Sequence, residues 1–163
     1  MDDRFLGNSY LDIDVRAVFF TMAYSSAPFM NVTNPGLGAR YPSTFWDADG
    51  AYLTGEHTYR LHLPPGIPAA LFWSVTTYSP VDGTMIDNGR PFPSVNSLDT
   101  RVVQEHDGSV DLHFAPELPP GAPEANWIRT NPGEGYAVTL RLYGATKPFY
   151  DQSWIPDDVV RIS

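Results

Sequence analysis

One predicted strand carries an unusual set of polar and aromatic side chains that could bind a ligand. Residues 70–78 are rich in aromatic and β-branched residues, which favour a strand. Side chains alternate along a strand, so one face would carry Phe72, Ser74, Thr76 and Tyr78. Hydroxyl groups in or near a protein interior need hydrogen-bond partners. This face is therefore either a hydrogen-bonded core or the wall of a ligand pocket.

A second predicted strand, within residues 139–143, carries an arginine between two leucines. Leu140 and Leu142 would face one side of the sheet, and Arg141 and Tyr143 the other. A guanidinium group can hold a carboxylate through two parallel hydrogen bonds, so Arg141 beside a phenol suits the anchoring of an acidic ligand. The structural alternative is an ion pair with one of the many aspartates, because an unpaired buried cation is costly.

These strands, together with Asn126-Trp127, define the predicted site. The pair follows a proline-rich run and could be a pocket rim or a plug in a loop. The predicted ligand-binding residues are Trp73, Ser74, Tyr78, Asn126, Trp127, Arg141 and Tyr143.

The favoured function is the binding of a small organic or acidic ligand, with no cofactor. One alternative is a cofactor-independent hydrolase or lyase, in which Arg141 anchors an anion and a Tyr or His is the acid–base group. Another is a structural or assembly module, in which the polar strand faces are satisfied core. No catalytic residue is identified.

Two other groups of polar residues resemble metal ligands, but their spacing favours structural roles. Asp47-Ala48-Asp49-Gly50 begins like a calcium loop, yet no later ligands complete it, so we expect a hairpin turn. His62 and His113 would share one sheet face with Asp111 if their strands are neighbours. No spacing supplies a further ligand there, so we expect no metal. Nucleophile-elbow, P-loop and dinucleotide motifs are absent from the sequence.

Composition excludes several classes of partner. The net charge is −9 with only ten scattered basic residues, which argues against nucleic acid and against an anionic membrane surface. The chain has no cysteine, so disulfides, thiolate nucleophiles and cysteine-based zinc sites are excluded. No signal peptide and no apolar run of about 20 residues is visible, so we expect a soluble, cytoplasmic protein.

The periodicity of the chain predicts one compact domain in two parts. Residues 1–44 form a helical lead-in and loop, with a helix over residues 9–24 and a loop over 31–43. Residues 45–163 form a turn-rich β-sandwich, because 16 prolines and 13 glycines separate short strand patterns. The expected strands are 51–53, 58–63, 70–78, 101–104, 110–114 and 136–143. The helix is apolar on nearly every side, so we also expect a homo-oligomer or a separate partner chain to cover it.

Taken in order, several short motifs resemble the domain of unknown function 1214 family, the C-terminal part of bacterial two-part 1254/1214 proteins. The matching residues are Asp47–Gly50, Leu53–Gly55, Tyr59–Leu61, Phe72–Tyr78, Asp107–Ser109, Asn126–Trp127, Arg141–Tyr143 and Trp154–Pro156. The lead-in pair Arg16-Ala17 also fits.

The resemblance covers nearly the whole chain and implies a mainly β fold, a jelly-roll-like antiparallel sandwich with an N-terminal helical segment. It implies little about chemistry. This chain departs from the family in two places. We expect the usual N-terminal partner domain to be replaced by a separate chain or by self-association, and Ile128-Arg129 follows Trp127 where the family tends to have Leu-Pro.

Overall fold

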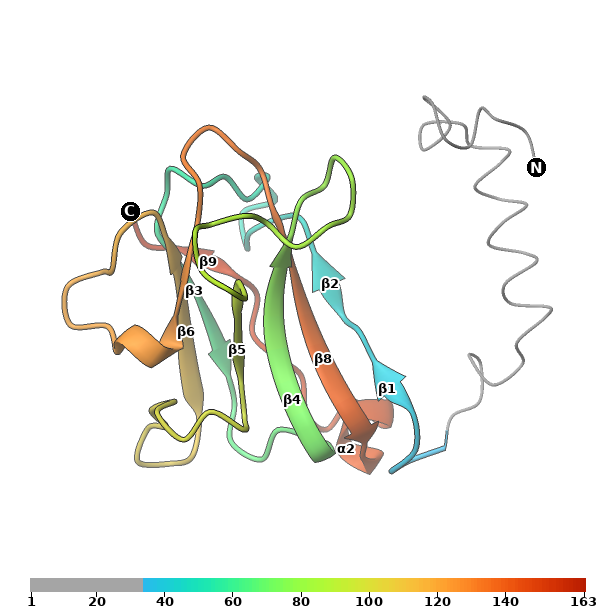
Figure 1. Cartoon of the computed structure of the whole chain (residues 1–163). Coiled ribbons are helices and arrows are strands. Elements are labelled where there is room, and N and C mark those ends of the chain that lie inside the picture. The colour runs from blue at the N-terminus through green and yellow to red at the C-terminus, as the bar shows by residue number, and fades with distance from the viewer. Residues whose placement is uncertain (1–33) are drawn as a thin grey trace, which may run out of the picture. The chain divides into compact units, whose positions relative to one another are not determined.

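The computed structural model describes residues 34–163, which form two β-sheets packed face to face (Figure 1). The helix predicted over residues 9–24, on which the expected self-association depends, lies outside the described residues. In residues 34–163 the first sheet has the order β1-β8-β4-β5, with β2 also paired to β8: β1 (Ala39–Arg40), β2 (Ser43–Thr44), β4 (Ala69–Tyr78), β5 (Ser94–Asn96) and β8 (Ala137–Ala145).

The second sheet has the order β7-β6-β3-β9: β3 (Tyr59–Leu63), β6 (Val110–Ala115), β7 (Trp127–Arg129) and β9 (Val160–Arg161). Two short helical turns accompany the strands, η4 (Glu124–Asn126) and α2 (Lys147–Tyr150). The mainly β fold is therefore confirmed. The pair β6–β7 is parallel, because the connection through η4 is long enough to return the chain in the same direction, so the second sheet is mixed.

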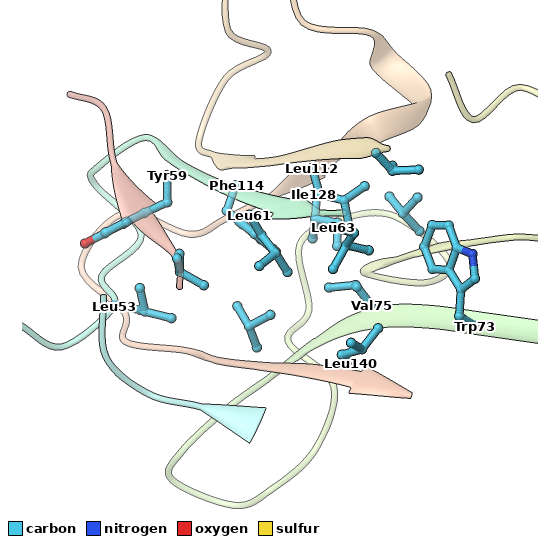
Figure 2. Close-up of a cluster of buried hydrophobic side chains, with 14 of the residues drawn as sticks. Leu53, Tyr59, Leu61, Leu63, Trp73, Val75, Leu112, Phe114, Ile128 and Leu140 are labelled. Atoms are coloured by element: carbon cyan, nitrogen blue, oxygen red, sulfur yellow. The ribbon is translucent and has the colours of Figure 1, made fainter. Parts of the chain in front are cut away.

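A single apolar core fills the space between the sheets. Figure 2 shows Trp73, Val75 and Leu140 of the first sheet pointing toward Leu63 and Leu112 of the second. All of these side chains are buried, and their alternation with outward-facing residues follows the period of two of a strand. Burial of this apolar surface is the main term that holds the sheets together.

The register of β4 against β8 contains one irregularity. Ala69 pairs with Ala145, but three residues later Phe72 pairs with Tyr143, so β4 contains one extra residue at this point. Such a bulge shifts every later pairing by one residue. From Phe72 onward the pairing is regular and brings Ser74 opposite Arg141.

The predicted strands agree with the structure in the long elements and fail in the short ones. The predictions at 58–63, 70–78, 110–114 and 136–143 correspond to β3, β4, β6 and β8. The segment 51–53 forms only an isolated bridge, between Tyr52 and Trp46, and the predicted loop over 31–43 contains β1 and the start of β2.

The strand predicted over 101–104 is wrong. The Val103 N–H donates to the side-chain oxygen of Asn126, and the Asn126 amide donates to the Val103 carbonyl oxygen, both at 2.8 Å. These two bonds replace the pairing that a neighbouring strand would provide.

Gly55, at the end of the matching segment Leu53–Gly55, allows two loops to approach closely. A Cβ atom at this position would lie 1.9 Å from the carbonyl oxygen of Asn131, which no side chain could tolerate. The Gly55 carbonyl oxygen also accepts a hydrogen bond from the buried Thr130 hydroxyl at 2.9 Å. The glycine therefore fixes the end of the sandwich where these loops meet.

The described chain contains no helix that is both long and apolar enough to cross a membrane.

Candidate functional site

The outer face of the first sheet carries the polar and aromatic residues that the sequence singled out. Phe72, Ser74 and Thr76 share one face, as the alternation predicts, and this face points away from the core into a cleft. Ser74 and Thr76 are nevertheless only 7% and 3% exposed, because neighbouring loops rise above the sheet on this side. Polar side chains that are covered on the face opposite the core are unusual for the solvent side of a sheet.

These loops enclose an open cleft of about 830 Å³ above β4, β5 and β8. One wall comes from residues 85–101, and another from η4 and the start of β7. Its lining combines hydroxyl, amide and guanidinium groups with apolar side chains: Phe72, Ser74, Thr76, Met85, Arg90, Phe92, Ser94, Asn96, Leu98, Asp99, Arg101, Glu124, Trp127 and Arg141. This volume falls in the range of small-molecule sites.

Three arginines line the cleft, but they differ in their partners. Arg101 makes two hydrogen bonds to Asp99, at 2.9 and 2.7 Å, and these hold the pKa of the Asp99 carboxyl down at about 2. Arg90 pairs with Glu124 at 3.3 Å. Arg141 has no carboxylate within salt-bridge distance anywhere in residues 34–163.

Arg141 is instead surrounded by aromatic groups. Its terminal NH2 nitrogen donates to the Tyr78 hydroxyl, and its guanidinium lies 5.4 Å from the Tyr78 ring centre and 5.8 Å from that of Tyr41. Its Nε is buried and has no hydrogen-bond partner in the described chain. A half-buried guanidinium that retains unused donors and lacks a counter-ion is prepared to receive an anion.

Two further donors lie beside Arg141 on the floor of the cleft. Ser74 pairs with Arg141 across β4 and β8, and with Asn96 across β4 and β5. The Asn96 side-chain oxygen accepts from the Leu98 N–H at 3.0 Å. Within residues 34–163, neither the Ser74 hydroxyl nor the Asn96 amide nitrogen has a hydrogen-bond partner. Arg141, Ser74 and Asn96 thus form a row of unused donors, which we call the donor row.

A smaller hollow of about 400 Å³ lies on the other side of Arg141. It is lined by Tyr41, Ser43, Tyr78 and Thr139, and Arg141 lines both spaces. Hydrogen bonding with Tyr143, and then burial, raise the pKa of Tyr41 above its usual value. Tyr41 therefore stays protonated at neutral pH.

The predicted site residues Tyr78 and Tyr143 both lie near Arg141. Tyr143 stacks on Phe72 with ring centres 4.3 Å apart and an angle of 11° between the planes. The rings of Tyr143 and Tyr41 also meet edge to face. The stacked pair borders the cleft through Phe72.

Of the remaining predicted site residues, one lines the cleft and two are buried in structural positions. Trp127 lines the cleft, held by a hydrogen bond from its indole N–H to the Ala115 carbonyl oxygen at 2.9 Å and by Arg90 stacked 4.4 Å from its ring centre. Asn126 is buried and bonds only to backbone groups. Trp73 belongs to the core (Figure 2), and Ser74, the next residue of β4, lies on the other face of the strand.

The sequence did not indicate several cleft residues. Asn96 and Ser94 belong to a three-residue strand flanked by prolines and turns, and Arg90, Asp99 and Arg101 lie in loops. A possible signal was the Ser-Val-Asn alternation of β5, which repeats the polar–apolar pattern of β4.

The second sheet confirms that β3 and β6 are neighbours, with His62 opposite Asp111 and Arg60 opposite His113. His62 Nδ1 lies 2.6 Å from the Asp111 carboxylate. No group of three or more potential metal-ligating side chains occurs in residues 34–163.

The predicted hairpin turn at Asp47 is confirmed. Its carboxylate accepts the backbone N–H groups of Asp49 and Ala51, at 3.0 and 2.9 Å.

Comparison with known proteins identifies solved structures with a similar fold. Two solved structures are similar to it: the VPA0106 protein from Vibrio parahaemolyticus, with a TM-score of 0.63 at 22% identity, and an uncharacterised protein from Burkholderia cenocepacia, with a TM-score of 0.57 at 21% identity. They match 78% and 77% of this chain, which spans 31% and 30% of their own lengths. No curated protein matches significantly.

A sequence profile described as "Protein of unknown function (DUF1214)" matches residues 38–147, which include every strand from β1 to β8. The predicted resemblance is therefore confirmed, and the chain belongs to the DUF1214 family.

Proposed function

We propose that this domain binds a small organic acid in the cleft above β4, β5 and β8, with the carboxylate of the ligand on Arg141. The observation that carries this proposal is the contrast between the three arginines. Arg90 and Arg101 are paired with acids, whereas Arg141 lines the cleft and has no carboxylate partner in residues 34–163. A bound carboxylate would supply the missing counter-ion and hydrogen bonds.

The donor row supports the same function. Ser74 and Asn96 offer a hydroxyl and an amide donor next to Arg141. A carboxylate contains only acceptors, so a row of donors matches it and mismatches a cation. Apolar lining side chains such as Phe72 and Phe92 would cover the carbon skeleton of the ligand.

The titratable groups favour binding over catalysis. Among described residues no histidine lines the cleft. The Asp99 carboxyl, with its lowered pKa, stays ionised and is a weak base. In the neighbouring hollow, the raised pKa of Tyr41 makes its phenol a poorer acid.

Replacing Arg141 by lysine tests the proposal, with titration calorimetry against a panel of simple carboxylates and their methyl esters. Lysine keeps the charge but loses the planar fork, so we expect the carboxylate affinity to fall about tenfold or more, with the fold retained. The esters should bind poorly to both proteins. Arg161→Lys, on the exposed edge strand β9, is the matched control and should bind like the wild type.

The opposite result would show that Arg141 is scaffold. If Arg141→Lys lowers the melting temperature while every carboxylate affinity stays unchanged, the guanidinium stabilises the sheet and does not hold a ligand.

A further inference from the structure

The outer face of the first sheet is organised in rows that run across its strands. The donor row contains Arg141, Ser74 and Asn96. Two residues further along β4 lies a row made only of hydroxyl side chains: Ser43 on β2, Thr139 on β8, Thr76 on β4 and Ser94 on β5. We call this second set the hydroxyl row.

The hydroxyl row is partly paired within itself. The Thr76 hydroxyl donates to the Ser94 oxygen at 3.1 Å, and Ser43 and Thr139 share a hydrogen bond of 2.8 Å. The Ser94 proton and the lone pairs of Thr76 have no partner in the described chain. Thr76 and Ser94 line the same cleft as the donor row, and Thr76 is almost completely covered.

From these rows we infer that the ligand is a hydroxylated carboxylate, such as a sugar acid. This inference rests on the proposed function, because it assigns the carboxylate to the donor row. It adds that hydroxyl groups of the ligand exchange hydrogen bonds with Thr76 and Ser94. A hydroxyl both donates and accepts, so it can use the free proton of Ser94 and the free lone pairs of Thr76 together.

The spacing of the rows sets the reach of the ligand. Two residues of an antiparallel strand span about 6.8 Å, so the ligand must carry hydroxyl groups at about that distance from its carboxylate. A six-carbon sugar acid in an extended conformation bears hydroxyls along its whole chain, and therefore reaches the second row. A short acid without hydroxyls would occupy the donor row alone.

Covered hydroxyls also give the cleft a means of selection. A site built to hydrogen-bond a ligand hydroxyl rejects an analogue without it, because the polar groups of the site lose water and gain no partner. Thr76 is 3% exposed, so its lone pairs meet this condition. The competing expectation comes from the apolar walls at Phe72 and Phe92, which would favour an aliphatic or aromatic acid.

The test compares gluconate with hexanoate, two six-carbon carboxylates that differ in their hydroxyl groups, and includes benzoate as an aromatic acid. We expect gluconate to bind the wild-type chain at least about tenfold more tightly than hexanoate in titration calorimetry. Thr76→Val removes one hydroxyl at nearly constant shape, so it should weaken gluconate while leaving hexanoate unchanged.

Thr77→Val provides the control, because Thr77 is the next residue of β4 and lies on its other face. It should leave the preference for gluconate intact. Ser94→Ala, on the short edge strand, is the second variant should Thr76→Val fail to fold, and it should likewise weaken gluconate alone.

The test separates a wrong ligand class from a wrong carboxylate site. If hexanoate or benzoate binds as tightly as gluconate and depends on Arg141, the hydroxylated class is wrong and the carboxylate site stands. The class is equally wrong if the preference for gluconate survives both Thr76→Val and Ser94→Ala. If no acid binds, or binding ignores Arg141→Lys, the proposed function fails and the inference fails with it.

Discussion

Replacing Asn126 by alanine should strongly destabilise the domain. The side chain is 2% exposed, accepts from the Val103 N–H at 2.8 Å, and donates to the carbonyl oxygens of Val103 and Asp111 at 2.8 and 2.9 Å. Each bond contributes about 1 kcal/mol net, and a buried group left unpaired costs about 1–3 kcal/mol. Val103 is partly exposed, so water can reach its groups, and the expected loss is about 2–4 kcal/mol.

Urea unfolding followed by tryptophan fluorescence measures this loss directly. For a chain of this length the loss corresponds to a fall in melting temperature of about 4–16 °C, at about 2–4 °C for each kcal/mol. Asn96→Ala is the control, because Asn96 is half-exposed and its side chain makes a single hydrogen bond, to the Leu98 N–H. That variant should lose less than about 1 kcal/mol.

A third variant, Asn126→Asp, makes the test sharper. Aspartate keeps the acceptor for Val103 but presents a second oxygen to two carbonyl oxygens, so it should be at least as destabilising as alanine. If Asn126→Asp is tolerated at neutral pH, or Asn126→Ala behaves like the Asn96 control, the side chain does not hold the segment at Val103 in place.

Three further predictions concern Gly144, Tyr136 and His113. Gly144→Ala should lower the free energy of unfolding more than Gly133→Ala does, by about 1 kcal/mol or more. Both glycines have positive φ, but only a Cβ at Gly144 would meet neighbouring atoms, at 3.3 Å. Chemical denaturation of the two variants measures the difference. Tyr136→Phe should raise stability by about 1 kcal/mol, because it removes a buried hydroxyl without a partner. Burial raises the pKa of Tyr136 far above 10, so the folded state keeps a proton that the unfolded state releases, and the wild type should lose stability above pH 10 more steeply than this variant. Burial lowers the pKa of His113 below 6.5, so the unfolded state binds a proton first and stability should fall below about pH 6.5; a flat profile there, or one that His113→Gln does not change, would contradict this.

The sequence predicted the long strands and the faces of their residues, because alternation of apolar and polar residues is a local signal. It placed Ser74 on the strand face opposite Trp73, and Arg141 on the face opposite Leu140, and the structure pairs Ser74 with Arg141. Trp73 entered the predicted site with its neighbours in the motif, although the same alternation puts it in the core, where the structure places it.

The walls of the cleft could not be predicted in this way. Residues 85–101 have almost no periodic pattern, and their position depends on side-chain bonds such as that from the Asn88 amide to the Arg129 carbonyl oxygen. The strand at 101–104 was wrong for the same reason, because the polar side chain that replaces its partner strand lies 23 residues away in the sequence. Contacts of this kind depend on tertiary packing and leave no local signal.

Register is the other quantity that local patterns leave open, and here it depends on the bulge in β4. Without the extra residue between Ala69 and Phe72, the pairing that starts at Ala69 and Ala145 would place Ser74 opposite Leu140. An outward hydroxyl would then oppose an inward leucine, and both the core and the donor row would be lost. The bulge lies opposite Gly144, whose positive φ and missing side chain leave room for Ala70 and Leu71. A glycine directly after the Arg-Leu-Tyr motif thus sets the pairing on which the proposed anion site depends.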